Sequence, residues 1–103
     1  MRFEVGEKSY ELVYSINVIA DMEETTGRSF ESIFTGPSIS ALRLLIWTGL
    51  ITKDPKMTLR QAGDIVQEYL AGGNSVESLT GVVTKAMSDA GFLAAQGAKR
   101  VKK

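Results

Sequence analysis

Apolar and polar residues alternate over the start of the chain and then follow a helical period. Phe3 and Val5 fall on one face, residues 6–8 supply a polar reversal, and Leu12 resumes the same face. This alternation predicts a β-hairpin over residues 2–14. Because two strands alone are only marginally stable, we expect the apolar face of the hairpin to lie on the helices that follow.

Five stretches with helical spacing come next, each opened by a capping side chain and closed near glycine or proline. They predict helices over residues 15–27, 29–35, 38–52, 58–71 and 75–90. The expected N-caps are Ser15, Ser29, Ser38, Thr58 and Ser75. The first apolar residues of the four longer helices, expected to point inward with the rest of each stripe, are Ile16, Ile39, Leu59 and Val76.

These elements predict a mainly helical α+β fold in which an N-terminal hairpin packs on a bundle of about five helices. The length of 103 residues fits a single domain, which we place over residues 1–93. Gly49 lies inside the apolar stripe of the most hydrophobic helix, where it costs about 1 kcal/mol relative to alanine. We therefore expect another part of the chain to pack closely against Gly49.

Four large apolar side chains lie off the main stripes. Trp47 and its neighbour Ile51 either widen the buried face of their helix or stay exposed as contacts for another protein. Phe92 and Leu93 follow the last predicted helix and either fold back on the domain or dock on a neighbour. All four are candidates for partner binding.

The composition removes most enzyme classes. The chain has no cysteine and no histidine, which excludes disulfides, thiolate chemistry, His-ligated metals and Ser–His–Asp triads. Asp21 and Glu24 have the spacing of a carboxylate pair, but no third ligand accompanies them, so we expect a solvated helix face. The glycines at 72–73 are too few for a phosphate loop. We expect no catalytic activity, no cofactor and no metal.

The formal net charge of zero hides an uneven distribution. Residues 1–31 hold seven acidic and three basic side chains, a balance of −4. Four of the last five residues are basic, which gives that end of the chain +4. We expect residues 94–103 to form a flexible basic tail, with tethering to an acidic partner or nucleic acid as the alternative.

A helix-turn-helix is a second interpretation of residues 58–87, where a short glycine-containing turn joins two helices. The would-be recognition helix carries only Lys85 as a base, together with Glu77 and Asp89. A helix that reads DNA needs several cations or amides for phosphates and base edges. A small DNA-binding regulator therefore stays an alternative that the charge pattern disfavours.

No targeting segment is visible at the start of the sequence. The longest apolar run, residues 44–47, is far too short to cross a bilayer. We therefore expect a cytoplasmic protein that does not enter membranes.

Several motifs of small and apolar residues are spread over residues 2–93. They are Phe3-x-Val5-x-Glu7-Lys8-x-Tyr10-x-Leu12, Met22-Glu23-x-x-x-Gly27, Gly49-Leu50, Thr58-Leu59-x-x-Ala62-x-x-Ile65-Val66-x-x-Tyr69, Gly73-Asn74-Ser75 and Ala90-Gly91-Phe92. In this order they resemble the tail assembly chaperones of long-tailed bacteriophages and their prophages. One departure is the hairpin turn at residues 6–8, where a tighter Gly-Lys pair is expected.

The resemblance implies a protein that holds the tape measure protein, a long helical chain, until tail tube subunits polymerise around it. It implies no enzymatic activity, action in the cytoplasm of the bacterial host, and absence from the finished virion. The implied partners are the tape measure protein, the tail tube protein and further copies of the same chain.

A chaperone of this kind needs an apolar and adaptable surface. Met22, Met57 and Met87 would suit such a surface, although filling the core is the commoner use of methionine. We include Met87 among the partner-binding candidates. A structural head–tail connector or minor tail protein would share the size and the helical content, and is the main alternative function.

Overall fold

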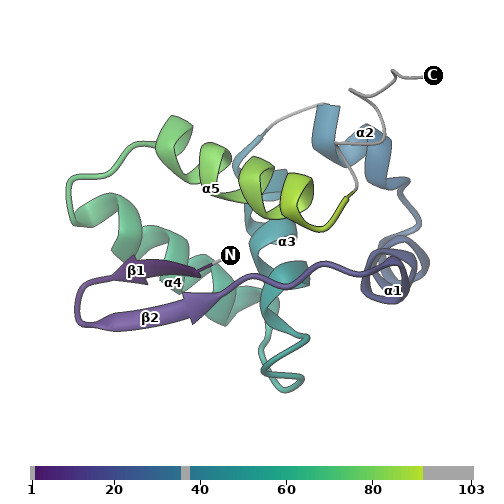
Figure 1. Cartoon of the computed structure of the whole chain (residues 1–103), viewed down its shortest axis with the longest axis horizontal. Coiled ribbons are helices and arrows are strands. Elements are labelled where there is room, and N and C mark those ends of the chain that lie inside the picture. The colour runs from purple at the N-terminus through teal and green to yellow at the C-terminus, as the bar shows by residue number, and fades with distance from the viewer. Residues whose placement is uncertain (1, 36–37, 92–103) are drawn as a thin grey trace.

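Helix α3 (Ile39–Leu50) lies at the centre of the molecule and contacts α1, α2, α4, α5 and β2. The structure is a computed structural model that describes residues 2–35 and 38–91, with the side chains of residues 34 and 35 left out. The remaining elements are β1 (Arg2–Val5), β2 (Lys8–Glu11), α1 (Ile16–Thr26), α2 (Phe30–Thr35), α4 (Leu59–Ala71) and α5 (Val76–Asp89). The predicted fold class, a hairpin packed on five helices, is confirmed (Figure 1).

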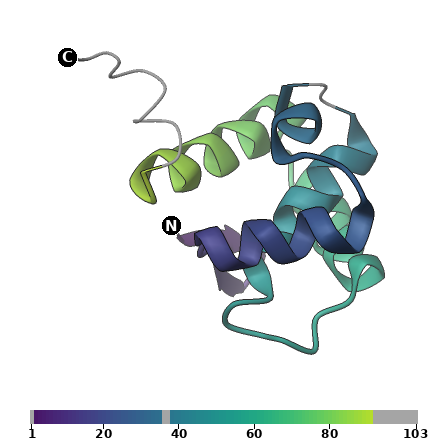
Figure 2. The same ribbon diagram turned by 90° about the vertical axis from the view of Figure 1, so that its right-hand side faces the viewer.

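Helix α3 is central because its sequence is apolar almost all the way round. Eight of its twelve residues are buried, which a helix achieves only when other elements cover several of its sides. The surrounding helices do so in both views (Figures 1 and 2). The loop that follows α3 projects from the bottom of the molecule, away from the N-terminal end of the helix.

The predicted helix starts are correct to within one residue because each is set by a local capping bond. Ser15, Ser38, Thr58 and Ser75 each accept a hydrogen bond from the backbone N–H three residues later. The Thr58 backbone N–H in turn donates a hydrogen bond to the side-chain oxygen of Gln61, which completes a capping box.

The hairpin reverses more tightly than the sequence suggested. Val5 pairs with Lys8, so only Gly6 and Glu7 form the loop, and Lys8 belongs to β2. Gly6 has a φ of 63°, and no residue other than glycine has a positive φ in the described part of the chain. A positive φ at the first loop position alone fits the two-residue type II′ turn that favours glycine there.

The apolar face of the hairpin lies on α4, as expected. The ring of Phe3 stacks against Tyr10 of the neighbouring strand, with ring centroids 5.8 Å apart. It meets the ring of Tyr69 on α4 edge-on at 6.0 Å. These aromatic contacts add to the burial of Phe3 and Val5, and they anchor the hairpin, whose two strands make up the sheet within the described residues.

Close packing at Gly49 is also confirmed. The segment after β2 crosses α3 at this position, and the Val13 N–H donates to the Gly49 carbonyl at 2.9 Å. A Cβ atom at Gly49 would lie 2.8 Å from both Leu12 Cδ2 and Tyr14 Cζ. The Tyr14 hydroxyl donates to the Leu45 carbonyl at 2.6 Å. Glycine is therefore required so that this segment can lie directly on the helix.

The expectation that the first apolar residue of each longer helix points inward is wrong. Ile16, Ile39, Leu59 and Val76 are the four large apolar residues that stand exposed in the described chain. Side chains on a helix lean toward its N-terminus, so a residue directly after the N-cap projects beyond the end of the helix. The helical period is right at these positions, but within residues 2–35 and 38–91 no neighbouring element covers these four side chains.

No helix within the described ranges is both long enough and apolar enough to cross a membrane. The predicted basic tail, residues 94–103, lies outside the described residues. The same holds for two of the partner-binding candidates, Phe92 and Leu93.

Candidate protein-binding groove

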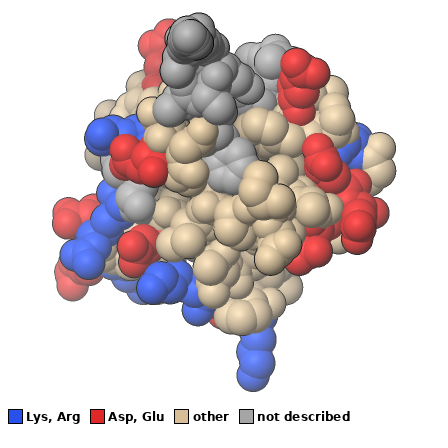
Figure 3. Space-filling view, turned by 45° about the vertical axis from the view of Figure 1, so that its right-hand side comes forward, with Lys and Arg blue, Asp and Glu red and all other residues tan. Residues whose placement is uncertain are grey.

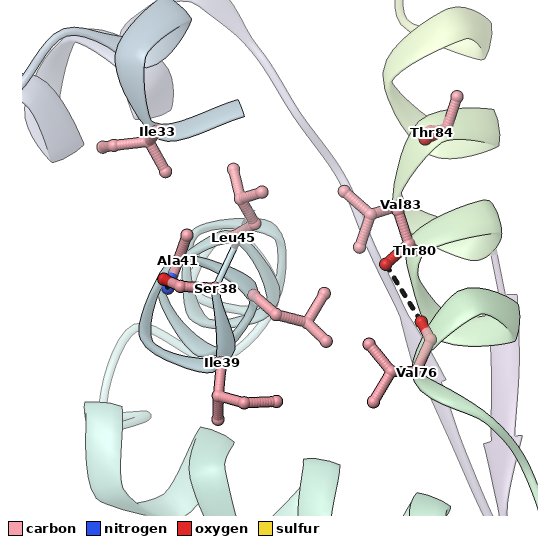
Figure 4. A pocket seen from close by; sticks show the side chains of 10 residues that line it. Ile33, Ser38, Ile39, Ala41, Leu45, Val76, Thr80, Val83 and Thr84 are labelled. Atoms are coloured by element: carbon pink, nitrogen blue, oxygen red, sulfur yellow. Dashed lines mark hydrogen bonds between the residues drawn. The ribbon is translucent and has the colours of Figure 1, made fainter. Parts of the chain in front are cut away.

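An apolar groove of about 400 Å³ lies between α3 and α5, beside the end of α2. Figure 4 shows it along the axis of α3, with α5 forming the opposite wall. The described residues that line it are Ile33, Ser38, Ile39, Ala41, Leu42, Leu45, Val76, Thr80, Val83 and Thr84. Seven of these ten are aliphatic, and the other three are serine or threonine, so the lining is uncharged and mainly apolar.

The two walls of the groove rise to exposed aliphatic side chains. Ile39 on α3 is 61% exposed and Val76 on α5 is 42% exposed, whereas Leu42 and Val83 below them are buried. The Thr80 hydroxyl donates to the Val76 carbonyl at 2.9 Å, so it is satisfied within its own helix (Figure 4). The groove therefore combines a fixed, buried floor with a rim that loses contact with water when a partner covers it.

Local sequence places both rim residues. Each follows a serine N-cap directly, as Ser38-Ile39 and as Ser75-Val76, and therefore stands at the first position of its helix. Helical periodicity places both residues in the buried stripes and therefore does not identify them as residues of a site. No local signal distinguishes them, because Ser15-Ile16 has the same pattern of a serine cap and a β-branched aliphatic residue but lies outside the groove.

A second, shallower hollow continues from the groove along α3 and α4. Ile39 lines both, and the second hollow adds Arg43, Arg60 and Asp64. The stem of Arg43 lies against Gly63, where an added Cβ would come within 3.0 Å of Arg43 Cδ. The groove is thus uncharged within and carries two arginines along one edge.

Two sequence-predicted partner residues lie at the other end of α3. Trp47 is half-buried, and its indole N–H donates to the Met57 carbonyl at 2.8 Å, which holds the loop between α3 and α4. Ile51 is half-buried and packs against the core. The structure does not bring either residue to the groove, which lies at the N-terminal end of α3.

The expectation that Met87 belongs to a binding surface is corrected by its burial. Met87 and Met22 are fully buried and fill the core, and Met57 is partly buried against it. Met87 lies on the inner face of α5 with Leu79 and Val83, where the helical stripe turns toward α3. A flexible side chain fills the irregular space there, so Met87 contributes to packing.

The charged residues singled out in the sequence lie on the surface. Asp21 and Glu24 are exposed on α1, and Glu23 accepts a hydrogen bond from the Phe30 N–H at 2.6 Å at the start of α2. Among the described residues no three acidic side chains come together in a way that could hold a metal ion. Lys85 forms an ion pair with Asp89 at 3.8 Å, so the one base of α5 is engaged within its own helix.

Charged and uncharged residues are separated on one face of the molecule. Figure 3 shows a broad band of residues without formal charge down the middle of this face, with acidic side chains gathered along its right-hand edge. Covering such residues with another protein avoids the large cost of burying an unpaired ion.

Comparisons of the chain with known protein families, with curated proteins and with solved structures found no match. The geometry of the groove and the motifs in the sequence therefore carry the functional interpretation. A concave, mostly apolar groove can take a small apolar ligand or the apolar face of an amphipathic helix.

Proposed function

We propose that the protein is a tail assembly chaperone that holds segments of a tape measure protein while the phage tail is built. The observation that carries this proposal is the uncharged groove between α3 and α5, rimmed by the exposed Ile39 and Val76. The sequence resemblance supplies the partner, and the groove supplies a surface of suitable chemistry.

A groove between two helices suits a helical partner. An amphipathic helix presents apolar side chains at intervals of three and four residues, and such a stripe can lie in an apolar groove. Burying a fully exposed aliphatic side chain contributes about 1.5–3 kcal/mol, and Ile39 and Val76 are only partly exposed. Each contact is therefore weak, so a single copy of the chaperone dissociates easily. Many copies bound along one long partner chain together keep that chain covered.

This mode of action needs no chemical step. The chaperone shields apolar stripes of the tape measure protein in the bacterial cytoplasm, and tail tube subunits replace it as they polymerise. Coverage of a long partner calls for many copies of the chain, which bind side by side. The finished virion then lacks the protein, whereas a head–tail connector would be found in purified particles.

Co-expression with an aggregation-prone tape measure segment tests the proposal. Ile39→Asp combined with Val76→Asp places charge on both walls, and we expect the segment to become insoluble. Ile16→Asp is the matched control, because Ile16 is 70% exposed at the same first helical position of α1 but lies outside the groove. An acidic residue at that position is compatible with the helix dipole, so all variants should fold.

The control variant should keep the segment soluble as well as the wild-type protein does. Thermal unfolding followed by circular dichroism verifies that the variants are folded. Equal loss of solubility with Ile16→Asp, or full solubility with the double groove variant, would show that the groove does not bind the segment.

A further inference from the structure

Two arginines at the edge of the groove have no acidic partner within residues 2–35 and 38–91. Arg43 on α3 and Arg60 on α4 line the hollow that continues the groove, and neither forms an ion pair there. Asp64 lies one helical turn after Arg60 and lines the same hollow without pairing with it. With two arginines and one aspartate, the charged residues of this edge have a net charge of +1.

The position of Arg60 is unfavourable in the isolated molecule. Arg60 is the second residue of α4, close to the positive end of the helix dipole, where a cation destabilises the helix and an anion stabilises it. A carboxylate from outside, placed beside Arg60, would relieve this repulsion and interact favourably with the helix end.

Arg43 has a buried hydrogen-bond donor without an acceptor among the described residues. Its Nε atom is shielded from solvent and makes no hydrogen bond in the described structure. A buried donor left unsatisfied costs free energy. Because Nε itself is shielded, a carboxylate from outside would pair with the terminal nitrogens of the guanidinium. The stem of Arg43 lies against Gly63, and Arg43 lines the hollow that continues the groove.

We propose that the occupant of the groove is an amphipathic helix whose aliphatic stripe is flanked on one side by acidic residues. The stripe lies between Ile39 and Val76, and the acidic flank meets Arg43 and Arg60. Arg43 is one turn after Ile39 on α3, about 6 Å along the axis, which matches one turn of a partner helix. This inference rests on the proposed function and specifies which segments of the tape measure protein are held.

Two synthetic helical peptides test the inference on the purified protein. They share one leucine stripe and differ only along one flank, which carries Glu in one peptide and Lys in the other. Fluorescence anisotropy at low salt should show the Glu peptide binding at least about tenfold more tightly, a difference of about 1.4 kcal/mol. The difference should shrink as salt is added, because exposed ion pairs are screened.

Charge reversal at the edge should remove this preference. Arg43→Glu with Arg60→Glu should bind the Lys peptide as well as, or better than, the Glu peptide. Arg28→Glu with Lys56→Glu is the matched control, because it makes the same change in net charge at exposed residues that line neither hollow. The control should keep the preference of the wild-type protein.

The outcomes separate the inference from the proposed function. Equal binding of the two peptides to the wild-type protein overturns the inference, even if tape measure segments stay soluble. A protein that prefers the Glu peptide but cannot solubilise those segments overturns the proposed function alone. If the protein self-associates in sedimentation and the arginine reversals abolish this, a second copy is the occupant, and the inference is overturned.

Discussion

At the scale of single residues, the contact between Tyr14 and Gly49 decides how the hairpin is joined to the helices. The phenol ring of Tyr14 fills the space that a side chain at Gly49 would need, and its hydroxyl donates a hydrogen bond to the Leu45 carbonyl. The Thr52 hydroxyl adds a bond to the Val13 carbonyl at 3.1 Å. The segment after β2 is therefore fixed along α3 by packing and by hydrogen bonds.

Substitution of two helical glycines by alanine should have opposite effects. Gly49→Ala forces its new Cβ to within 2.8 Å of Leu12 and Tyr14, so we expect it to destabilise the protein by about 1–3 kcal/mol. Gly81→Ala in α5 meets nothing within 4 Å and should stabilise the protein by up to about 1 kcal/mol. Urea unfolding measures both, and a stable Gly49→Ala variant would contradict the packing described here.

The pH dependence of stability should report the burial of Tyr14. Burial raises the pKa of its hydroxyl well above the ordinary value of about 10. Above pH 10 the unfolded chain releases this proton while the folded chain keeps it, so the folded state binds more protons. The free energy of unfolding therefore decreases as the pH rises above 10, by up to about 1.4 kcal/mol per pH unit for this group.

Tyr14→Phe separates the two contributions of the hydroxyl. The variant loses the bond to the Leu45 carbonyl and should be less stable at pH 7 by about 1 kcal/mol. It also lacks the ionisable group, so its stability should fall less steeply than that of the wild-type protein between pH 10 and 12. If the free energy of unfolding falls equally with pH in the two proteins, the Tyr14 hydroxyl loses its proton as readily in the folded as in the unfolded state, which would contradict its burial.

At the scale of the elements, the helices are predictable and their mutual arrangement is not. Helix starts depend on short-range bonds such as the capping box of Thr58 and Gln61, which a sequence displays directly. The groove arises because α3 and α5, far apart in the chain, leave their first residues uncovered. Periodicity alone placed Ile39 and Val76 in the core, since it cannot tell which turns of a stripe a neighbouring element covers.

Trp47 shows the same limit for a single side chain. Its position off the main stripe left both burial and partner contact open, and in the structure the half-buried side chain donates from its indole N–H to the Met57 carbonyl. That bond joins residues ten apart across a loop whose conformation no sequence pattern displays.

Trp47→Phe should loosen this loop without changing partner binding. The ring still packs against the core but cannot donate to Met57, so we expect a loss of about 1 kcal/mol of stability. Backbone amides in the loop of residues 52–57 should exchange their hydrogens faster, and tape measure segments should stay soluble. A selective loss of solubilisation with unchanged stability would instead place the partner at Trp47.

At the scale of the whole molecule, the core and the proposed binding surface share residues. The core is built around α3 and supplies the buried floor of the groove, while Ile39 and Val76 at the rim stay exposed. The charge is divided as well, because the first 31 residues are acidic in balance and the groove edge carries Arg43 and Arg60. Because the rim and edge residues are not fully buried, the proposed contacts with a partner can form and break without unfolding of the core.

Methyl NMR of the isotopically labelled protein during titration with a soluble tape measure segment tests the central proposal most directly. The proposal predicts that the largest shifts fall on methyl groups of Ile39, Leu42, Val76 and Val83, with Ile16 unchanged. Shifts that centre on Ile16 or Ile51, or a spectrum that does not change at all, would contradict binding in the groove between α3 and α5.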